Sequence, residues 1–308
     1  MSVVLKSLTP VQSDSGFICM TPAFLDLTRA RRYRAFNMAA SRVLPQNVRP
    51  FQAHCAHGLL PMVTDSSRSE AVRSLESGDV QSAPDATLSG VFRSYFDSLL
   101  AAHGPQHWWP GRTRFEIIVG AILTQNTSWS NVERAIRNLR AARLLSPDAI
   151  LSVPSAKLAQ LLRPSGYFRQ KTKTLKSFVK FLHDAHEGSL TRLFASPKQV
   201  LRDQLLSLRG IGPETADSIL LYAGKHPVFV VDAYSRRILE RHGLSLPQAH
   251  YEELRALFET SLPCDHQLFN EFHALIVHVG KNYCRPSNPR CSECSLSRFL
   301  PQSTLPST

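Results

Sequence analysis

The segment 205–220 carries residue types and a spacing that suit the binding of a phosphate group. An apolar helix is followed by Gly210, Ile211 and Gly212, and Pro213 then opens a second helix. Proline fits there because the first turn of a helix leaves its N–H groups unpaired in any case. The glycines let the backbone approach a ligand closely, and the free amides of the second helix attract anions. The pattern predicts an anion-binding hairpin with Ile211 packed between its helices; an ordinary helix–helix turn is the alternative.

The elements expected to hold this hairpin are helices. Leu88–His103 places its apolar residues on one face with a period of 3.6, and Phe115–Leu123 is nearly all apolar, as in a buried central helix. The strand-like stretch Val228–Val231 is too short and too isolated to start a sheet. The sequence therefore predicts an all-α protein. Its further helices are predicted at 130–141, 147–151, 155–162, 169–186, 198–206, 213–223, 233–241, 248–261 and 266–280.

The first 85 residues differ from the rest of the chain. They show no sustained helical or strand period and are rich in Ser, Pro and Ala. We interpret residues 1–86 as a disordered extension with one short helix near 23–36. The sequence has no run that predicts a membrane span, no secretory signal, and no cysteine pattern typical of a secreted disulfide framework. An intracellular protein that does not enter a membrane is expected.

The positive charge lies in the part that is predicted to fold. The net charge is +12. Residues 1–85 hold nine of the 36 basic and seven of the 24 acidic residues, so residues 86–308 carry ten of the twelve net charges. This favours a polyanionic partner such as a nucleic-acid backbone. Many basic proteins bind no nucleic acid, so charge alone does not decide between the two interpretations.

The hairpin resembles the helix-hairpin-helix of the HhH-GPD DNA glycosylase superfamily, which includes endonuclease III. Two further motifs match the family in the same order. Residues 115–127 resemble its buried helix and base-stack wedge loop, and residues 228–237 contain its second loop and the aspartate Asp232. The resemblance runs from about residue 88 to residue 299.

This resemblance implies a two-domain fold. A six-helix domain at 116–226 would contain the hairpin. A second helical domain would be formed by both ends of the folded region, 87–115 and 227–300. A disordered tail is expected at 301–308.

The resemblance assigns catalysis to Asp232. Breaking a glycosidic bond builds positive charge on the sugar, which a nearby carboxylate stabilises while it orients or deprotonates the attacking water. Asp232 is also expected to cap the helix that begins at Ala233. Family members that nick DNA use a lysine amine to form a Schiff base, and Glu214 stands at that position, 18 residues before Asp232. A carboxylate forms no imine, so AP-lyase activity is not expected unless Lys225 or Lys281 supplies the amine.

The base pocket is also predicted from the resemblance. A flipped base needs an aromatic wall and a matching polar edge. Trp108, Trp109 and Pro110, together with Trp129, resemble residues that line the pocket in the 3-methyladenine DNA glycosylase subgroup, and Lys281 is a match for its pocket lysine. A cationic alkylated purine would gain from stacking on electron-rich rings. Core packing is the alternative role for each tryptophan.

A set of DNA contacts follows from the same resemblance. Gln125 and Asn126 would fill the hole that the flipped base leaves, with capping of the preceding helix as the alternative. The hairpin would hold a phosphate, and two arginines of a basic loop near the C-terminus would touch others. The residues expected to contact DNA are Gln125, Asn126, Gly210, Ile211, Gly212, Thr215, Arg285 and Arg290.

The cysteines near the C-terminus match an iron–sulfur motif incompletely. Cys284, Cys291 and Cys294 have the spacing of three of the family's four ligands. The fourth place is Leu300, whereas cluster iron is normally held by four thiolates. Three possibilities for this loop stay open: a 4Fe–4S cluster with a water or external molecule as fourth ligand, a zinc ion, or no metal at all.

Together these features predict a monofunctional DNA glycosylase of base excision repair that hydrolyses the N-glycosidic bond of an alkylated, 3-methyladenine-type base. Gly120 stands where relatives that act on mismatched adenine have a glutamate as general acid. An alkylated base is an easier leaving group and needs little help from a general acid. The alternatives are a bifunctional endonuclease III-type glycosylase with AP-lyase activity and a non-catalytic hairpin protein that binds DNA. A monomer on double-stranded DNA with a flipped base is expected. Its location would be cytoplasmic, at the nucleoid, if the source is bacterial, with a nuclear or organellar location left open.

Overall fold

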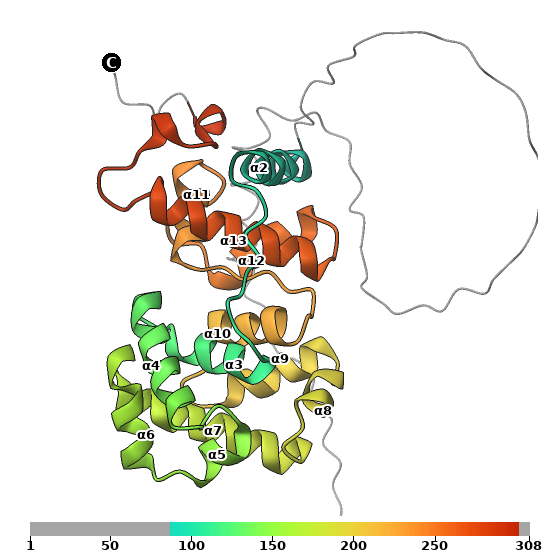
Figure 1. Cartoon of the computed structure of the whole chain (residues 1–308). Helices are drawn as coiled ribbons and strands as arrows, with labels where there is room; N and C mark the ends of the chain where they lie inside the picture. The colour runs from blue at the N-terminus through green and yellow to red at the C-terminus, as the bar shows by residue number, and fades with distance from the viewer. Residues whose placement is uncertain (1–86, 302–308) are drawn as a thin grey trace, which may run out of the picture. The chain divides into compact units, whose positions relative to one another are not determined.

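A computed structural model of the chain describes residues 87–301, and these residues fold into helices without any strand (Figure 1). The prediction of an all-α protein is confirmed. The α-helices of the described part are α2 (Leu88–His103), α3 (Arg114–Leu123), α4 (Trp129–Ala141), α5 (Pro147–Ser152), α6 (Ser155–Leu162), α7 (Phe168–His186), α8 (Leu190–Ala195), α9 (Lys198–Ser207), α10 (Pro213–Ser218), α11 (Ala233–Arg241), α12 (Tyr251–Ser261) and α13 (His266–Asn282). The shorter helical segments are η1 (Arg163–Ser165), η2 (Ile219–Ala223), η3 (Cys291–Glu293) and η4 (Ser297–Phe299).

Most predicted helix bounds agree with the structure to within two residues, and two helices differ by more. The predicted helix 248–261 begins at Tyr251, because His250 and Glu253 form a capping box at its start. Helix α8 was not predicted, because six residues are too few to show a helical period and no proline marks its start, unlike the equally short α5 that begins at Pro147. The helix predicted near 23–36 and the disorder predicted for 1–86 lie outside the described residues, as does the disordered tail predicted for 301–308, apart from its first residue. No helix within 87–301 combines the length and apolar character that crossing a bilayer requires.

Helix α3 is the central helix of the part that contains the hairpin. Its residues are buried almost throughout, and it packs against α4, α7, α10 and η2. The side chain of Thr113 caps its first turn by accepting a hydrogen bond from the N–H of Glu116 at 3.1 Å. A helix that is apolar on all sides is expected to be buried by its neighbours, as α3 is here.

A cluster of phenylalanines fixes the extended segment 228–231. Phe229 stacks on Phe258 with ring centroids 3.8 Å apart, and Phe92 stacks on the same ring at 4.5 Å. The segment pairs with no strand in the described structure; its amides instead donate to side chains of α12. The N–H of Phe229 donates to Glu259 Oε1 at 2.9 Å, and the N–H of Val231 lies 3.4 Å from the hydroxyl of Tyr251. These contacts hold the backbone directly before Asp232.

All described residues belong to one compact unit. Within it, α13 packs along α11 and against α2, and α2 also packs against α12 (Figure 1). The division into a domain at 116–226 and a second domain at 87–115 and 227–300 stays a prediction.

Candidate active site

Asp232 is the N-cap residue of α11, as the sequence predicts. Its Oδ1 accepts hydrogen bonds from the N–H of Ser235 at 2.8 Å and from the hydroxyl of Ser235 at 3.0 Å. Only 14% of its side chain is exposed. The cap therefore fixes one carboxylate oxygen and leaves Oδ2 as the oxygen that can meet a ligand.

His273 lies opposite that second oxygen. Its Nε2 is 3.5 Å from Asp232 Oδ2, which is longer than a good hydrogen bond, so the two side chains interact mainly through their charges and dipoles. Burial alone would raise the pKa of Asp232, but His273 and the hydrogen bonds from Ser235 outweigh it and hold the pKa below its ordinary value. Asp232 is consequently a carboxylate at neutral pH.

Tyr222 connects His273 with the predicted base pocket. Its hydroxyl is hydrogen-bonded to Nδ1 of His273 inside the core. Its ring lies 4.8 Å from the ring of Trp109, measured between centroids. Burial raises the pKa of Tyr222 well above its ordinary value, so the hydroxyl stays protonated and can donate to Nδ1. The histidine would then direct its Nε2 proton toward Asp232.

The three tryptophans form one aromatic group. Trp109 meets Trp129 edge to face at 5.3 Å, and Trp108 lies 5.4 Å from Trp109 and 6.1 Å from Trp129. Trp109 also covers Gly120, where an added Cβ would lie 3.2 Å from the indole Nε1. All three rings are half-buried. They pack on one another while part of each surface stays accessible, which suits both core packing and the stacking of a flat ligand.

Glu214 lies in the first turn of α10, and its residue is exposed. The protein around its carboxyl group nevertheless displaces water. This desolvation and the negative charge of Asp232 raise the pKa of Glu214 to about 7, with His273 acting in the opposite direction. A carboxyl group within electrostatic reach of Asp232 therefore occupies the position where the sequence predicts the lysine of bifunctional relatives to be missing.

The hairpin is joined to the loop after α3 by Gln125. Its side-chain amide donates to the carbonyl of Gly210 at 2.9 Å and to Thr215 Oγ1 at 2.8 Å. Gly210 has φ +91°, and a Cβ there would lie 2.2 Å from Thr174 Oγ1, so glycine is required. The side chain of Ile211 is 5% exposed and packs in the core, which leaves only its backbone for a ligand. Gly212 is exposed at the start of α10.

A hollow of about 680 Å³ lies beside the hairpin. Basic and aromatic side chains line it next to Gly210, and Tyr167 at its edge is 68% exposed. Its lining residues are Gln125, Asn126, Tyr167, Gln170, Lys171, Lys173, Thr174, Ser177, Arg209 and Gly210. Positive charge and an exposed aromatic ring beside a phosphate-binding hairpin are features of nucleic-acid surfaces.

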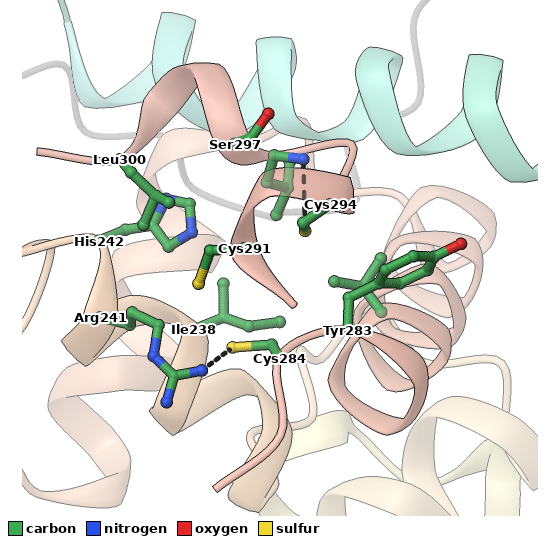
Figure 2. A pocket seen from close by; sticks show the side chains of 11 residues that line it. Ile238, Arg241, His242, Tyr283, Cys284, Cys291, Cys294, Ser297 and Leu300 are labelled. Carbon is green, nitrogen blue, oxygen red and sulfur yellow. Dashed lines mark hydrogen bonds between the residues drawn. The ribbon is translucent and has the colours of Figure 1, made fainter. Parts of the chain in front are cut away.

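The three cysteines of the C-terminal loop gather around one small space, as Figure 2 shows. Cys284 Sγ accepts a hydrogen bond from the guanidinium of Arg241 at 3.0 Å, and Cys294 Sγ lies 3.5 Å from the N–H of Leu296. Leu300 lines the same space at the place of the fourth ligand. The enclosed volume is about 10 Å³, roughly the room for a single water.

These residues do not fit the four-thiolate cluster of the resemblance. The fourth position offers an apolar side chain, and Arg241 already engages one of the sulfurs. Among residues 87–301, no group of three or more His, Cys, Asp or Glu side chains is arranged to hold a metal ion. We therefore derive no chemistry from a cluster at this loop.

The remaining predicted residues lie apart from Asp232 or at the surface. Pro110 and Lys281 are exposed, and Lys281 follows His273 by eight residues of α13, about 12 Å along the axis. Arg285 and Arg290 are exposed, and Arg290 pairs with Glu293. The roles assigned to these residues and to the pocket and hairpin residues stay predictions.

Sequence reasoning missed His273 and Tyr222. Each is a polar residue inside an otherwise apolar helical stretch, and that pattern could have marked them as partners of a buried site. Lys171 was missed as well. Its amine is buried and donates to the carbonyls of Leu123 at 2.9 Å and Ser165 at 2.7 Å.

The chain is similar to known proteins of DNA base excision repair. Residues 119–264 match the family described as HhH-GPD superfamily base excision DNA repair protein. The chain is 46% identical over 203 residues to a protein of Methanocaldococcus jannaschii whose name assigns it to the DNA repair glycosylases. That alignment covers 65% of this chain and 91% of the relative.

Two solved structures resemble the chain. One is the H. pylori 3-methyladenine DNA glycosylase bound to 1,N6-ethenoadenine, with 31% identity, a TM-score of 0.53 and coverage of 63% of this chain and 97% of that one. The other is a trapped endonuclease III–DNA covalent intermediate, with 21% identity, a TM-score of 0.60 and coverage of 69% of this chain and 95% of that one. At 21% identity, the similarity to this second structure shows only that the two chains share a fold.

Proposed function

Because the chain belongs to the HhH-GPD superfamily of base excision DNA repair proteins, we propose that it is a monofunctional DNA glycosylase acting on alkylated purines of the 3-methyladenine type. It binds double-stranded DNA as a monomer, with the damaged base turned out of the stack. The observation that carries the proposal is the continuous line of side chains from Asp232 through His273 and Tyr222 to Trp109. This line of contacting side chains places a carboxylate close to aromatic rings on which a base can stack.

Each part of this line has a chemical use. The ionised Asp232 stabilises the positive charge that forms on the sugar as the bond to the base breaks. The tryptophan group offers faces for a cationic purine. The likeness to a 3-methyladenine DNA glycosylase at 31% identity supports the same substrate class. The hairpin at Gly210 and the net positive charge favour the DNA backbone as partner.

The absence of an amine at Glu214 supports the monofunctional reaction. A carboxylate cannot form the Schiff base through which glycosylases with lyase activity cut the strand. The product would be an intact strand with an abasic site.

The proposal is tested by excision from duplexes that carry 3-methyladenine, thymine glycol, uracil or mismatched adenine, each read with and without alkali. We expect release of methyladenine, with strand breaks only after alkali. Release of thymine glycol with breaks before alkali would instead identify a bifunctional enzyme in which another amine acts.

A further inference from the structure

Two backbone amides hold the extended segment 228–231 in place, and both donate to side chains of α12. The N–H of Phe229 donates to Glu259 Oε1 at 2.9 Å, and the N–H of Val231 donates to the hydroxyl of Tyr251 at 3.4 Å. Both donor residues are buried. Buried amides need a partner, so here a helix takes the place that a neighbouring strand would have in a sheet. The two contacts therefore fix the backbone that leads to the carboxylate of the site.

A buried ion pair joins the two helices of the hairpin. Arg202 of α9 donates to Asp217 of α10 from Nε to Oδ1 at 2.6 Å and from Nη2 to Oδ2 at 3.1 Å. The two side chains are 6% and 0% exposed. A guanidinium that meets a carboxylate at two points fixes its orientation as well as its distance. This pair thus sets how α9 and α10 lie on either side of the turn at Gly210.

The hydroxyl of Tyr251 connects this ion pair with the segment 228–231. It donates to Asp217 Oδ2 at 2.9 Å and accepts from the N–H of Val231. Because a carboxylate that is paired with an arginine only accepts hydrogen bonds, the single hydroxyl proton goes to Asp217 and a lone pair is left for the amide. One oxygen atom therefore bridges the second helix of the hairpin and the backbone before the site.

A row of charges joins the same elements by a second path. Arg202 Nη2 also donates to Glu252 Oε1 at 2.7 Å, and Glu252 pairs with Arg255 at 2.9 Å. Arg255 lies 3.8 Å from Glu259, which accepts the amide of Phe229. Both amides of the extended segment are therefore linked to the hairpin, one through a single hydroxyl and the other through alternating charges of α12.

We propose that Tyr251 is a positioning residue of the reaction, which sets Asp232 relative to the DNA-binding hairpin. The proposal rests on the glycosylase function proposed above. The hairpin would hold the DNA backbone while Asp232 has to meet the sugar, so the separation of the two decides whether the carboxylate reaches its place. Tyr251 contacts both sides, since Asp217 belongs to the hairpin and Val231 directly precedes Asp232. A misplacement of about 1 Å can cost roughly 10²-fold in rate without the loss of any contact to the substrate.

The test is Tyr251→Phe in the full chain, which removes the hydroxyl and both of its hydrogen bonds but keeps the ring. We expect single-turnover release of 3-methyladenine from duplex DNA at saturating protein to slow roughly 10-fold or more. The affinity for a duplex with an abasic-site analogue should be unchanged, because the hairpin itself stays intact. A purely structural role of Tyr251 would not separate rate from affinity in this way.

Tyr95→Phe is the matched control. The hydroxyl of Tyr95 is hydrogen-bonded to Nδ1 of His242 at 2.7 Å, and His242 ends α11, ten residues or about 15 Å along the axis from Asp232. Each variant loses one hydroxyl and leaves its partners unpaired, so both should melt at lower temperature. Only Tyr251→Phe should slow excision.

Asp217→Asn tests the same link from the side of the hairpin. If Asp217 and Tyr251 act through one hydrogen bond, the double variant should excise no more slowly than Asp217→Asn alone. The proposal is overturned if Tyr251→Phe keeps the wild-type rate, if Tyr95→Phe slows excision as much, or if the two rate losses simply add. Failure of the proposed function would look different, because the wild type itself would then release no base.

Discussion

Oδ2 of Asp232 lies 3.5 Å from Nε2 of His273, while its other oxygen is held by Ser235. The carboxylate is thus fixed at one oxygen by the start of α11, while its other oxygen faces a histidine from a helix far away in sequence. A group held in this way needs no rearrangement when positive charge develops on a substrate, and such preorganised charge is the main source of electrostatic catalysis.

The first prediction concerns the charge of Asp232. Asparagine caps helices as well as aspartate does, so Asp232→Asn should fold normally and keep its bond to Ser235. It loses the negative charge, and we expect excision to be abolished while affinity for duplex DNA is retained. Glycosylase assays and DNA-binding titrations check the two halves. Wild-type excision by this variant would remove Asp232 from the mechanism.

A second prediction concerns the position of Glu214. If this residue faces the sugar, Glu214→Lys places an amine where a Schiff base can form. Borohydride should then trap a covalent adduct between this variant and lesion-containing DNA. Glu214→Gln serves as the control and should give none. A lysine variant that binds DNA but yields no adduct would show that residue 214 does not face C1′.

Much of the fold was predictable, because local patterns determine it. Apolar periodicity determines the bounds of α2, and an acidic cap residue marks the start of α11. The bounds of both helices were predicted to the residue. Helix α8 was not predicted, since six residues carry no period and no proline marks the first turn, as Pro147 does for α5. In the candidate site, only locally encoded features could be predicted, namely Asp232 as the cap of α11 and Gly210 as a turn residue of the hairpin. His273 reaches Asp232 through the packing of α13, which no local pattern encodes.

A third prediction uses the C-terminal loop. Leu300 stands where a fourth thiolate would complete the ligand set around Cys284, Cys291 and Cys294. Leu300→Cys should therefore bind iron after anaerobic reconstitution and show the broad visible absorbance of a cluster, whereas Leu300→Ala should not. Iron per chain and the absorption spectrum measure the outcome. A wild-type protein that carries a complete four-iron cluster would contradict our view of this loop.

A fourth prediction concerns stability and pH. The folded-state pKa of Glu214, about 7, exceeds its ordinary value of 4.5, so between these pH values the folded state binds more protons than the unfolded state. Stability from this group is full below pH 4.5 and is lost as pH rises through 7. The full shift corresponds to roughly 3 kcal/mol, and we expect about 1 kcal/mol because Glu214 is exposed and screened.

Glu214→Gln should therefore be more stable than the wild type at pH 8 and equally stable near pH 4.5. Thermal unfolding at the two pH values measures the difference. A variant with the same advantage at both pH values would owe its stability to something other than this titration.

The last prediction compares two lysines of α7. Lys171 donates to the carbonyls of Leu123 and Ser165, which end α3 and η1, and thereby holds the backbone next to Gln125 and Tyr167. Lys176 donates to the carbonyls of Leu151 and Val153 in the same manner, but it serves a loop outside the hollow beside the hairpin.

Lys171→Met leaves two buried carbonyls without their donor, at about 1–3 kcal/mol of stability for each unsatisfied group. Lys176→Met should lose less stability, because water can reach the carbonyls that the more exposed Lys176 binds. Both variants should therefore melt at lower temperature. Only Lys171→Met should also bind duplex DNA more weakly, because it alone releases the two segments that border the hollow. Lys171→Arg tests whether another cation restores the affinity. Equal loss of DNA binding in the Lys176→Met control would mean that α7 stabilises the fold as a whole and does not position these loops.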